Sequence, residues 1–567
     1  MSGSAELPTR VNSSGTKRMN VSMKSSNANH LKRAITMAIA CGMLLIVPAC
    51  IPNLRRPEPG PVLPASFNGT TTSENSSQLG IDEFYHDPLL TKLIEQALMG
   101  NRELKILEQE IQIANNEILA RRGAYLPFVT LGAMAGLDKP SLYTPMGAVE
   151  NQLNVLPGVP FPNPLPNFMF GANLFWRLDI YRQMRNARDA AAQRYLAAID
   201  RRNFFVTRMV ADIAEDYYGL VALDRRLENL DITIALQQRS LDVARAQFEA
   251  ARLTELPVQR FQAEVRKNQS EKLIINQEII QVQNRINFLV NRYPQYVERM
   301  SADFTDFFDL NIHALSAGVP SQLLANRPDI RQAERDLAAA GLDVKVARAN
   351  FFPQLTITGG IGYDAFNPKY LLITPEALIY NIAGGLAAPL INFKAIKADY
   401  LTANAKQLQA VYNYQRVILE AFTQVINRLT MVENYRKSIE IKKLQLEALV
   451  ASVEIASSLF QNARADYVDV LFAQRDMMDA RMVLITTKRE QLSAIAKAYQ
   501  ALGGGTPKTP PGLPPLPASP AQVPARPVSD LPPALPAGGA PSPADGAQPP
   551  AGGAQPPAGG APPPAGP

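Results

Sequence analysis

The sequence predicts an α+β membrane protein built from two similar halves, each with two amphipathic strands followed by a very long helical region. The stretch FPQLTITGGIGYD, residues 352–364, alternates Leu, Ile and Gly with Thr and Gly, as a strand with two different faces does. The stretch LPFVTLGAMAGLD, residues 126–138, has Pro, Thr, Gly and Asp at matching places. Long runs almost free of Gly and Pro follow each pair of strands, which favours helices there.

The N-terminal region carries a targeting pattern. Lys32 and Arg33 precede an apolar run at 34–49, which is shorter than the roughly 20 residues of a membrane-spanning helix. This pattern is typical of an export signal. The run ends in VPAC, which resembles the lipobox of bacterial lipoproteins, so we expect cleavage before Cys50 and lipidation of that cysteine. The other reading is an ordinary cleavage site followed by an incidental cysteine.

Cleavage at this point defines the first two segments. Residues 1–49 are a polar extension plus lipoprotein signal, and residues 50–85 are a lipidated N-terminal linker. Cys41 lies inside the signal, so the mature chain keeps one cysteine and no intrachain disulfide is expected.

An internal repeat organises the rest of the chain. Pairs related by a constant shift of 212 are Leu174 and Leu386, Leu178 and Leu390, Phe248 and Phe460, Ala251 and Ala463, Arg252 and Arg464, and Gln262 and Gln474. The first half carries about fourteen extra residues in the Pro-rich stretch 137–167, where an exposed loop is expected. We assign residues 86–300 to the first repeat, 301–322 to a linker and 323–502 to the second repeat.

The second strand of each half is less regular than the first. The candidates are FMFGANLFWRL at 168–178 and ALIYNIAGGLAAPL at 377–390. In the latter, Tyr380, Ile382, Leu386 and Leu390 share one face. Each chain therefore supplies four strands.

The helical regions are too long to be single straight elements. Residues 391–502 contain no Gly or Pro, and a helix of that length would extend for about 170 Å. We expect each region to fold back near its middle, at AARLTELPV (250–258) and NARADYVDV (462–470). Pro257 is expected to supply the break in the first half. Their frequent charges place these helices in water, packed through narrow apolar stripes.

The C-terminal segment differs in composition from both repeats. Residues 503–567 hold 22 of the 46 prolines, with reiterated GGAQPPA units. Such a segment cannot bury a core, and we predict a disordered tail rich in Pro, Gly and Ala.

Composition argues against several functions. The net charge of +6 is dispersed among nearly as many acids, which is unlike a nucleic-acid-binding surface. The three histidines, His30, His86 and His313, stand apart, and no phosphate loop or nucleophile motif is present. We therefore expect no enzyme activity, no catalytic residues, no cofactor, no metal and no nucleic-acid partner.

Four strands of about ten residues match the height of transmembrane β-strands, but four strands cannot close a barrel. Open edges leave backbone groups unpaired in lipid, so several chains must complete one barrel. Two chains give eight strands and a filled interior, whereas three give twelve and leave a lumen. The other reading is a soluble α+β protein with an ordinary buried sheet.

One family carries these features together. The segment LLANRPDIRQAERDLAAAGLDVKVARANFFPQLTITGGIGYD, residues 323–364, resembles the second-repeat signature of TolC-like outer membrane efflux proteins, in their lipoprotein branch. Further matches are WRLDIYR (176–182), PLINF (389–393) and ALGGG (501–505), and the resemblance covers roughly residues 80–505.

The resemblance implies a homotrimer whose twelve-stranded β-barrel in the outer membrane continues into a long α-helical barrel across the periplasm. Such a protein is lipid-anchored among outer membrane lipids and passively conducts small molecules such as drugs and toxic compounds. The implied partners are a periplasmic adaptor and an inner-membrane pump, often of the resistance-nodulation-division (RND) type. The open alternatives are a periplasm-spanning structural lipoprotein and an exit duct for secreted proteins.

The resemblance also implies roles for the helical tips. VDVL at 468–471 matches the family's tip motif, which places Asp469 in a carboxylate ring at a periplasmic constriction, with Asp466 one turn earlier. A second acid ring found in some members is replaced here by Phe472. The alternative for both acids is a solvated surface. The adaptor-contacting tips would be Ala251, Arg252, Ala463 and Arg464.

Overall fold

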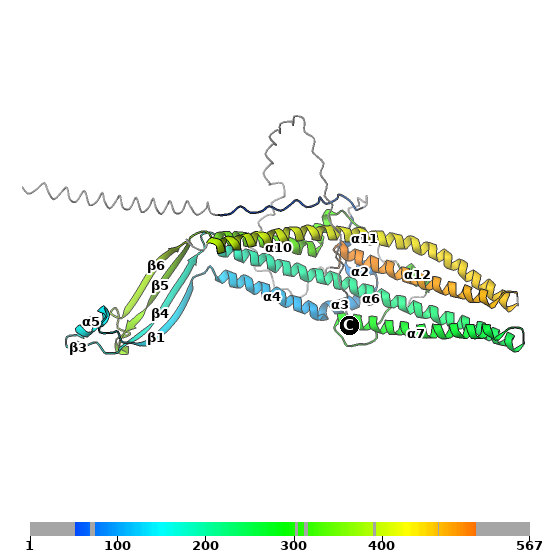
Figure 1. The fold of residues 1–567 in the computed structure, drawn as a ribbon, viewed down its shortest axis with the longest axis horizontal. Coiled ribbons are helices and arrows are strands. Elements are labelled where there is room, and N and C mark those ends of the chain that lie inside the picture. The colour runs from blue at the N-terminus through cyan, green and yellow to red at the C-terminus, as the bar shows by residue number, and fades with distance from the viewer. Residues whose placement is uncertain are drawn as a thin grey trace, which may run out of the picture. The chain divides into compact units, whose positions relative to one another are not determined.

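One four-stranded sheet and two helical hairpins make up most of the described chain (Figure 1). The computed structural model describes residues 51–67, 74–300, 304–310, 316–388, 393–462 and 464–505. Cys50, Ala463 and the tail from residue 506 lie outside the described residues. The elements, in chain order, are η2 (Ser76–Gln78), α2 (Ile81–Tyr85), α3 (Pro88–Gly100), α4 (Arg102–Gly123), β1 (Phe128–Asp138), α5 (Pro145–Gln152), β2 (Asn154–Leu156), β3 (Val159–Pro160), β4 (Leu165–Leu178), α6 (Gln183–Glu249), α7 (Glu255–Val290), α8 (Phe304–Asp309), α9 (Ser321–Asn326), α10 (Pro328–Ala349), β5 (Gln354–Ala365), η3 (Pro368–Tyr370), β6 (Leu378–Ala387), α11 (Phe393–Gln461) and α12 (Tyr467–Ala501).

The sheet contains the four predicted strands in the order β1-β4-β5-β6, and every neighbouring pair is antiparallel. Each strand lies inside or beside the stretch that the sequence pattern predicted for it. Because β1 and β6 are the outer strands of this order, each has a neighbour on only one side within the described chain.

The pairing register gathers unlike residues on the two faces of the sheet. One row across three strands is Leu178, Leu355 and Leu386, all apolar. Another row is Asn173, Gly360 and Asn381, which are small or polar. Residues two apart share a face, so the rows of one face are mainly Leu, Ile, Ala and aromatic residues, and those of the other are mainly Gly, Thr and Asn.

In each hairpin the first helix is longer than the second, which corrects the expectation of a turn near the middle. α6 and α11 contain 67 and 69 residues, whereas α7 and α12 contain 36 and 35. The turns lie in the predicted segments, but about two thirds of the way along each helical region rather than at its middle. Pro257 does not form the break, because it lies buried in the first turn of α7, where a missing N–H costs little.

Each of the long helices α6 and α11 has two shorter helices packed along different parts of its length. α4 packs beside one part of α6 and α7 beside another. They meet at Asn101, whose side-chain oxygen accepts the Leu104 N–H at 3.0 Å and whose amide donates to Leu289 O at 2.8 Å. One asparagine thus caps the start of α4 and satisfies a free carbonyl at the end of α7.

The second half uses an arginine at the equivalent junction. Arg327, in the motif NRPDI, is only 3% exposed and donates from Nη1 to Ala501 O, at the end of α12, at 2.9 Å. Asp329 accepts from the same guanidinium at 2.6 Å, so the buried charge is paired. The motif therefore joins α12 to the start of α10.

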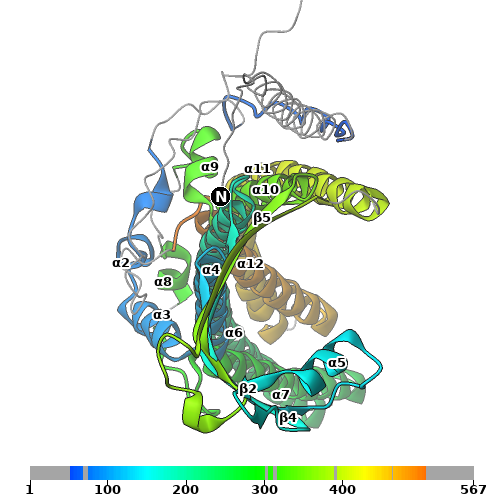
Figure 2. The same cartoon turned by 90° about the vertical axis from the view of Figure 1, so that its left-hand side faces the viewer.

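Short helices and the N-terminal segment cover one side of the long helices. Figure 2 shows the strands and long helices following one curved layer, with α2, α3, α8 and α9 on its convex side. Phe84 of α2 stacks on Tyr499 of α12, with ring centroids 3.9 Å apart, in the largest buried cluster. Within the described ranges, no helix combines the length and hydropathy needed to cross a membrane.

Candidate functional site

The first hairpin turns at a left-handed alanine. Ala251 has φ +54°, which L-residues with a Cβ rarely adopt. Its N–H bonds Phe248 O at 2.9 Å, and the next N–H, of Arg252, bonds Gln247 O at 2.9 Å. This pair of hydrogen bonds is a Schellman motif that ends α6.

The second hairpin repeats this bond. Arg464 N–H donates to Leu459 O at 2.8 Å, the counterpart of the Arg252 bond at a shift of 212. Ala463, the counterpart of Ala251, lies outside the described residues. Arg252 and Arg464 are both exposed at the turns, and neither has an ion-pair partner within the described part of the chain.

The predicted constriction residues lie at the start of α12. Asp466 is its N-cap and Asp469 belongs to its first turn, with Asp469 N–H donating to Asp466 O at 3.2 Å. Both are exposed, and Phe472 is 56% exposed one turn further on. The three residues therefore follow one another along the beginning of the helix.

Two further acids extend this row, and the sequence reasoning missed them. Asp476 and Asp479 are exposed on α12, and no ion pair involves either within the described residues. Their spacing of seven and ten residues from Asp469 was the available signal, because such spacings return to one helix face. Together with Asp466 and Asp469 they form the α12 acidic row.

The orientation of this row follows from contacts on the other side of α12. Lys488 donates to Leu310 O at 3.1 Å and Tyr499 donates to Leu79 O at 2.8 Å, so this side faces the covering segments. Burial lowers the pKa of Lys488 to about 8. Asp476 and Asp479 lie about 120° and 180° around the helix from Lys488, at about 100° per residue. Asp476 and Asp479, the later part of the acidic row, therefore point away from the convex side.

Another group of charged residues lies where α6 packs on α12. Glu215 accepts from Lys497 at 2.7 Å and from Ser493 at 2.8 Å, which join α6 to α12. The neighbouring Asp216 is 7% exposed. Burial raises its pKa to about 6, although Arg285 at 3.0 Å opposes the shift.

The sheet is hollowed on its small and polar face. A cavity of about 390 Å³ lies over the middle of the strands, along the rows that contain Gly132, Gly171, Gly362 and Asn381. Gly171 and Gly362 oppose each other in the register. A Cβ on Gly362 would lie 2.5 Å from Phe170 O, so the two strands approach too closely for any side chain there.

The N-terminal segment reaches the strand end of the helices. Ile51 and Leu54 pack on a cluster that includes Phe351 and Tyr400, and Phe351 lies between α10 and β5. Cys50 itself is outside the described residues. The residue that follows the predicted lipidation site is thus next to the sheet.

The described residues contain no group of three or more His, Cys, Asp or Glu side chains placed to hold a metal ion. His86 lies just after α2, far in sequence from the acidic row, and the other two histidines fall outside the described ranges.

Comparison with known proteins gives one consistent result. A family model described as "Outer membrane efflux protein" matches residues 93–292 and 319–504. "Cation efflux system protein CusC" of Escherichia coli O6:H1 is 25% identical over 441 residues, covering 78% of this chain and 91% of the relative. "Toluene efflux pump outer membrane protein TtgI" of Pseudomonas putida is 25% identical over 431 residues, covering 75% and 87%. "Probable outer membrane lipoprotein SilC" of Salmonella typhimurium is 23% identical over 483 residues, covering 82% and 98%.

Solved structures share the fold. The outer-membrane channel OprN superposes with a TM-score of 0.69 at 22% identity, covering 81% of this chain and 99% of its own. The open MtrE outer membrane channel of Neisseria gonorrhoeae gives a TM-score of 0.69 at 21% identity, covering 80% and 98%.

Proposed function

Because the chain belongs to the outer membrane efflux protein family, we propose that three copies form a duct that passively conducts small molecules across the outer membrane. The family consists of efflux channel proteins, which are not enzymes. In the proposed assembly, a twelve-stranded barrel continues into an α-helical barrel in the periplasm.

The observation that carries this proposal is that the layer has open edges along its whole length. The sheet ends in β1 on one side and β6 on the other. Beside it, α4 and α11 are the outer helices, because α4 packs on α6, α6 on α10 and α10 on α11. Towards the tips, α7 and α11 are outermost, because α6 packs on both α7 and α12 and α12 packs on α11. A head-to-tail ring joins each open edge to its complement in the next copy.

The exposed apolar residues fit such a ring. Leu401 and Leu419 share one exposed face of the outer helix α11, and Ile106 and Ile113 share one exposed face of the outer helix α4. All four are more than 40% exposed, which is costly for a free surface but expected for helices that pack on a second copy.

The sheet has the height and the two faces of a membrane-spanning wall. β1 contains 11 residues, which at about 3.3 Å each and a tilt of about 45° rise roughly 25 Å. In the ring, the apolar face is towards lipid and the Gly, Thr and Asn face is towards the lumen. Three copies supply the twelve strands that leave such a lumen.

The N-terminal segment supports the proposed lipid anchor. Because Ile51 and Leu54 pack beside the strand ends, acyl chains on Cys50 would enter the periplasmic leaflet next to the barrel. The relative described as an outer membrane lipoprotein, SilC, fits the same arrangement. We therefore place the mature chain in the outer membrane, lipid-anchored and extending into the periplasm.

The tips are the proposed contact for partners. In the ring, the α12 acidic row faces the bore, where Asp466, Asp469 and Phe472 form the periplasmic constriction. The exposed turns at Ala251, Arg252 and Arg464, with Ala463, are the proposed docking points for a periplasmic adaptor. An inner-membrane pump, of the RND type, would supply the energy. The repeats at 86–300 and 323–502, the linkers at 50–85 and 301–322 and the tail from 503 complete the proposed organisation.

Two measurements test the proposal. The native mass of the detergent-solubilised mature protein, with detergent subtracted, is expected to equal three chains. The same sample in a planar bilayer is expected to give discrete conductance steps. A stable monomer leaves an unclosed four-stranded sheet and would refute the duct.

A further inference from the structure

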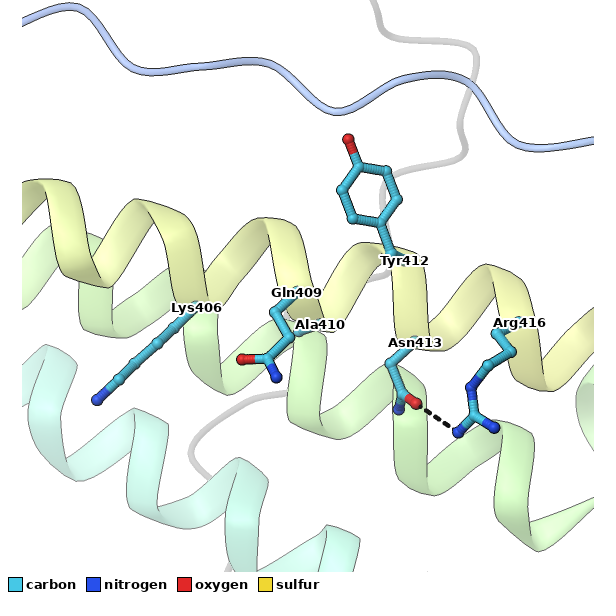
Figure 3. Close-up of a pocket in the computed structure, with 6 residues that line it drawn as sticks. All are labelled: Lys406, Gln409, Ala410, Tyr412, Asn413 and Arg416. Carbon is cyan, nitrogen blue, oxygen red and sulfur yellow. Dashed lines mark hydrogen bonds between the residues drawn. The ribbon is translucent and has the colours of Figure 1, made fainter. Parts of the chain in front are cut away.

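An open hollow of about 460 Å³ lies on α11, between the sheet and the middle of the helix. Its lining comes from this one helix: Lys406, Gln409, Ala410, Tyr412, Asn413 and Arg416. Figure 3 shows Lys406, Gln409, Asn413 and Arg416 extending on one side of the helix, whereas Tyr412 points away from them. Spacings of three and four residues put these four side chains on one face.

The charges of this face favour an anion. No carboxylate is among the lining residues, which include two cations. Lys406 has no ion-pair partner within the described residues. Arg416 has Glu420 at 3.6 Å, and both side chains are more than half exposed, so this pair is weak.

The amides add directed donors. Arg416 Nη2 donates to Asn413 Oδ1 at 2.9 Å, which fixes the orientation of that amide. The NH₂ group of Asn413 then remains for an acceptor, as does the NH₂ group of Gln409 beside it. The four donors are spread over about 15 Å of helix, and each cation has an amide donor three residues away, so each such pair suits the oxygens of a carboxylate, a sulfonate or a phosphate.

The position of the N-terminal segment shows which way this face points. Asn404 and Gln415 of α11 hydrogen-bond to Arg55 and Glu58 of that segment. Lys406 is two residues from Asn404 and Asn413 is nine, which is about 200° and 180° around the helix. The hollow is therefore on the side of α11 opposite the covering segment.

We propose that this face is an anion-binding site of the bore, where oxyanionic groups of passing solutes are held transiently. The inference rests on the proposed trimeric duct, because only there does this side of α11 line a lumen. Three copies bring six cations to the bore, three at each of two levels about 15 Å apart along the helix, and low-dielectric walls strengthen their combined field. The site lies between the acidic tips and the barrel, so a solute meets negative charge first and positive charge later.

The test uses the full mature protein in planar bilayers, with naphthalene-1,5-disulfonate as the probe. We expect this anion to reduce the potassium chloride current in a saturable way. The double variant K406Q/R416Q is expected to weaken this block about tenfold, as the loss of two exposed charge contacts predicts. The weakening should diminish at about 1 M salt, where the Debye length is about 3 Å.

A matched control separates this site from general charge effects. Lys397 lies on α11 seven residues before Asn404, on the side of the covering segment, and is exposed without an ion-pair partner among described residues. The variant K397Q is expected to keep the block unchanged. An equal loss of block in K397Q would overturn the inference.

Other outcomes also decide the matter. Unblocked wild-type current, or unchanged block in K406Q/R416Q, overturns the site and leaves the duct intact. If the double variant loses its trimeric mass, the cations hold neighbouring copies together and the site is again refuted. If no variant and no wild-type sample conducts, the proposed duct itself fails.

Discussion

The turn at Ala251 offers a sharp test of how the hairpin tip is built. An L-residue in the left-handed region costs roughly 1–2 kcal/mol relative to a right-handed one, and glycine avoids this strain. This gain in stability is reduced by roughly 0.5–1 kcal/mol, because glycine loses more conformational freedom on folding than alanine does. The variant Ala251→Gly is therefore expected to stabilise the closed turn by about 0.5–1 kcal/mol.

Hydrogen exchange of the tip amides measures this local free energy, because the Arg252 N–H must leave Gln247 O to exchange. A gain of 0.5–1 kcal/mol slows exchange about two- to fivefold. The matched control is Ala250→Gly. Ala250 has φ −79° and gains nothing from glycine, so its exchange should become faster. Unchanged or faster exchange in Ala251→Gly would show that the strain argument is wrong.

Three further outcomes are expected. Asp216→Asn should stabilise the fold at pH 7 by about 1–3 kcal/mol, because burial raises the Asp216 pKa from 3.8 to about 6 and ionisation is therefore costly. Because the pKa is raised in the folded state, protonated Asp216 stabilises the fold fully below about pH 4, and this stability is lost as pH rises through 6. The melting temperatures of the two proteins should therefore become equal near pH 4. A constant difference in melting temperature across this range would contradict the prediction. Gly362→Ala should prevent correct pairing of β4 with β5, because its Cβ would lie 2.5 Å from Phe170 O, and heat-resistant trimers on gels should be lost. Asp476→Asn with Asp479→Asn should reduce the cation selectivity of the conductance, read from reversal potentials in a salt gradient, by about twofold or more; an unchanged reversal potential would put both acids outside the bore.

Most of the strands and helices were predictable, because they follow periodic patterns of apolar and polar residues. Alternation located all four strands within three residues at their starts and ends, and the shift of 212 paired the two hairpins. The unequal arms were not predictable in this way. The shorter arms end at long-range hydrogen bonds from Asn101 to Leu289 and from Arg327 to Ala501, which no local propensity records.

The features of the candidate site also divide into those that the sequence predicts and those that it does not. Asp469 was predicted as a constriction residue because it belongs to the tip motif VDVL, and Asp466 because it lies one turn earlier, whereas Asp476 and Asp479 lie beyond the motif. The left-handed conformation of Ala251 was hidden because alanine normally signals a helix interior. The direction in which the hollow beside Lys406 faces was inferred from the side of α11 that the N-terminal segment covers. That contact joins residues more than 340 positions apart, so local sequence patterns do not reveal it.

The two halves share a backbone but differ in charge at the tips of their hairpins. Positions of α7 that correspond to the α12 acidic row and Phe472 are Thr254, Pro257, Arg260, Glu264 and Lys267. In α7, the single acid of this set, Glu264, pairs with Lys267 at 3.5 Å, whereas all four acids of α12 are unpaired within the described residues. Neighbouring positions in a ring of three copies would therefore alternate between a neutralised hairpin and a strongly acidic one. Repulsion at a closed tip must then arise between α12 helices of different copies, so cations that relieve it should act on the second hairpin and leave the first unaffected.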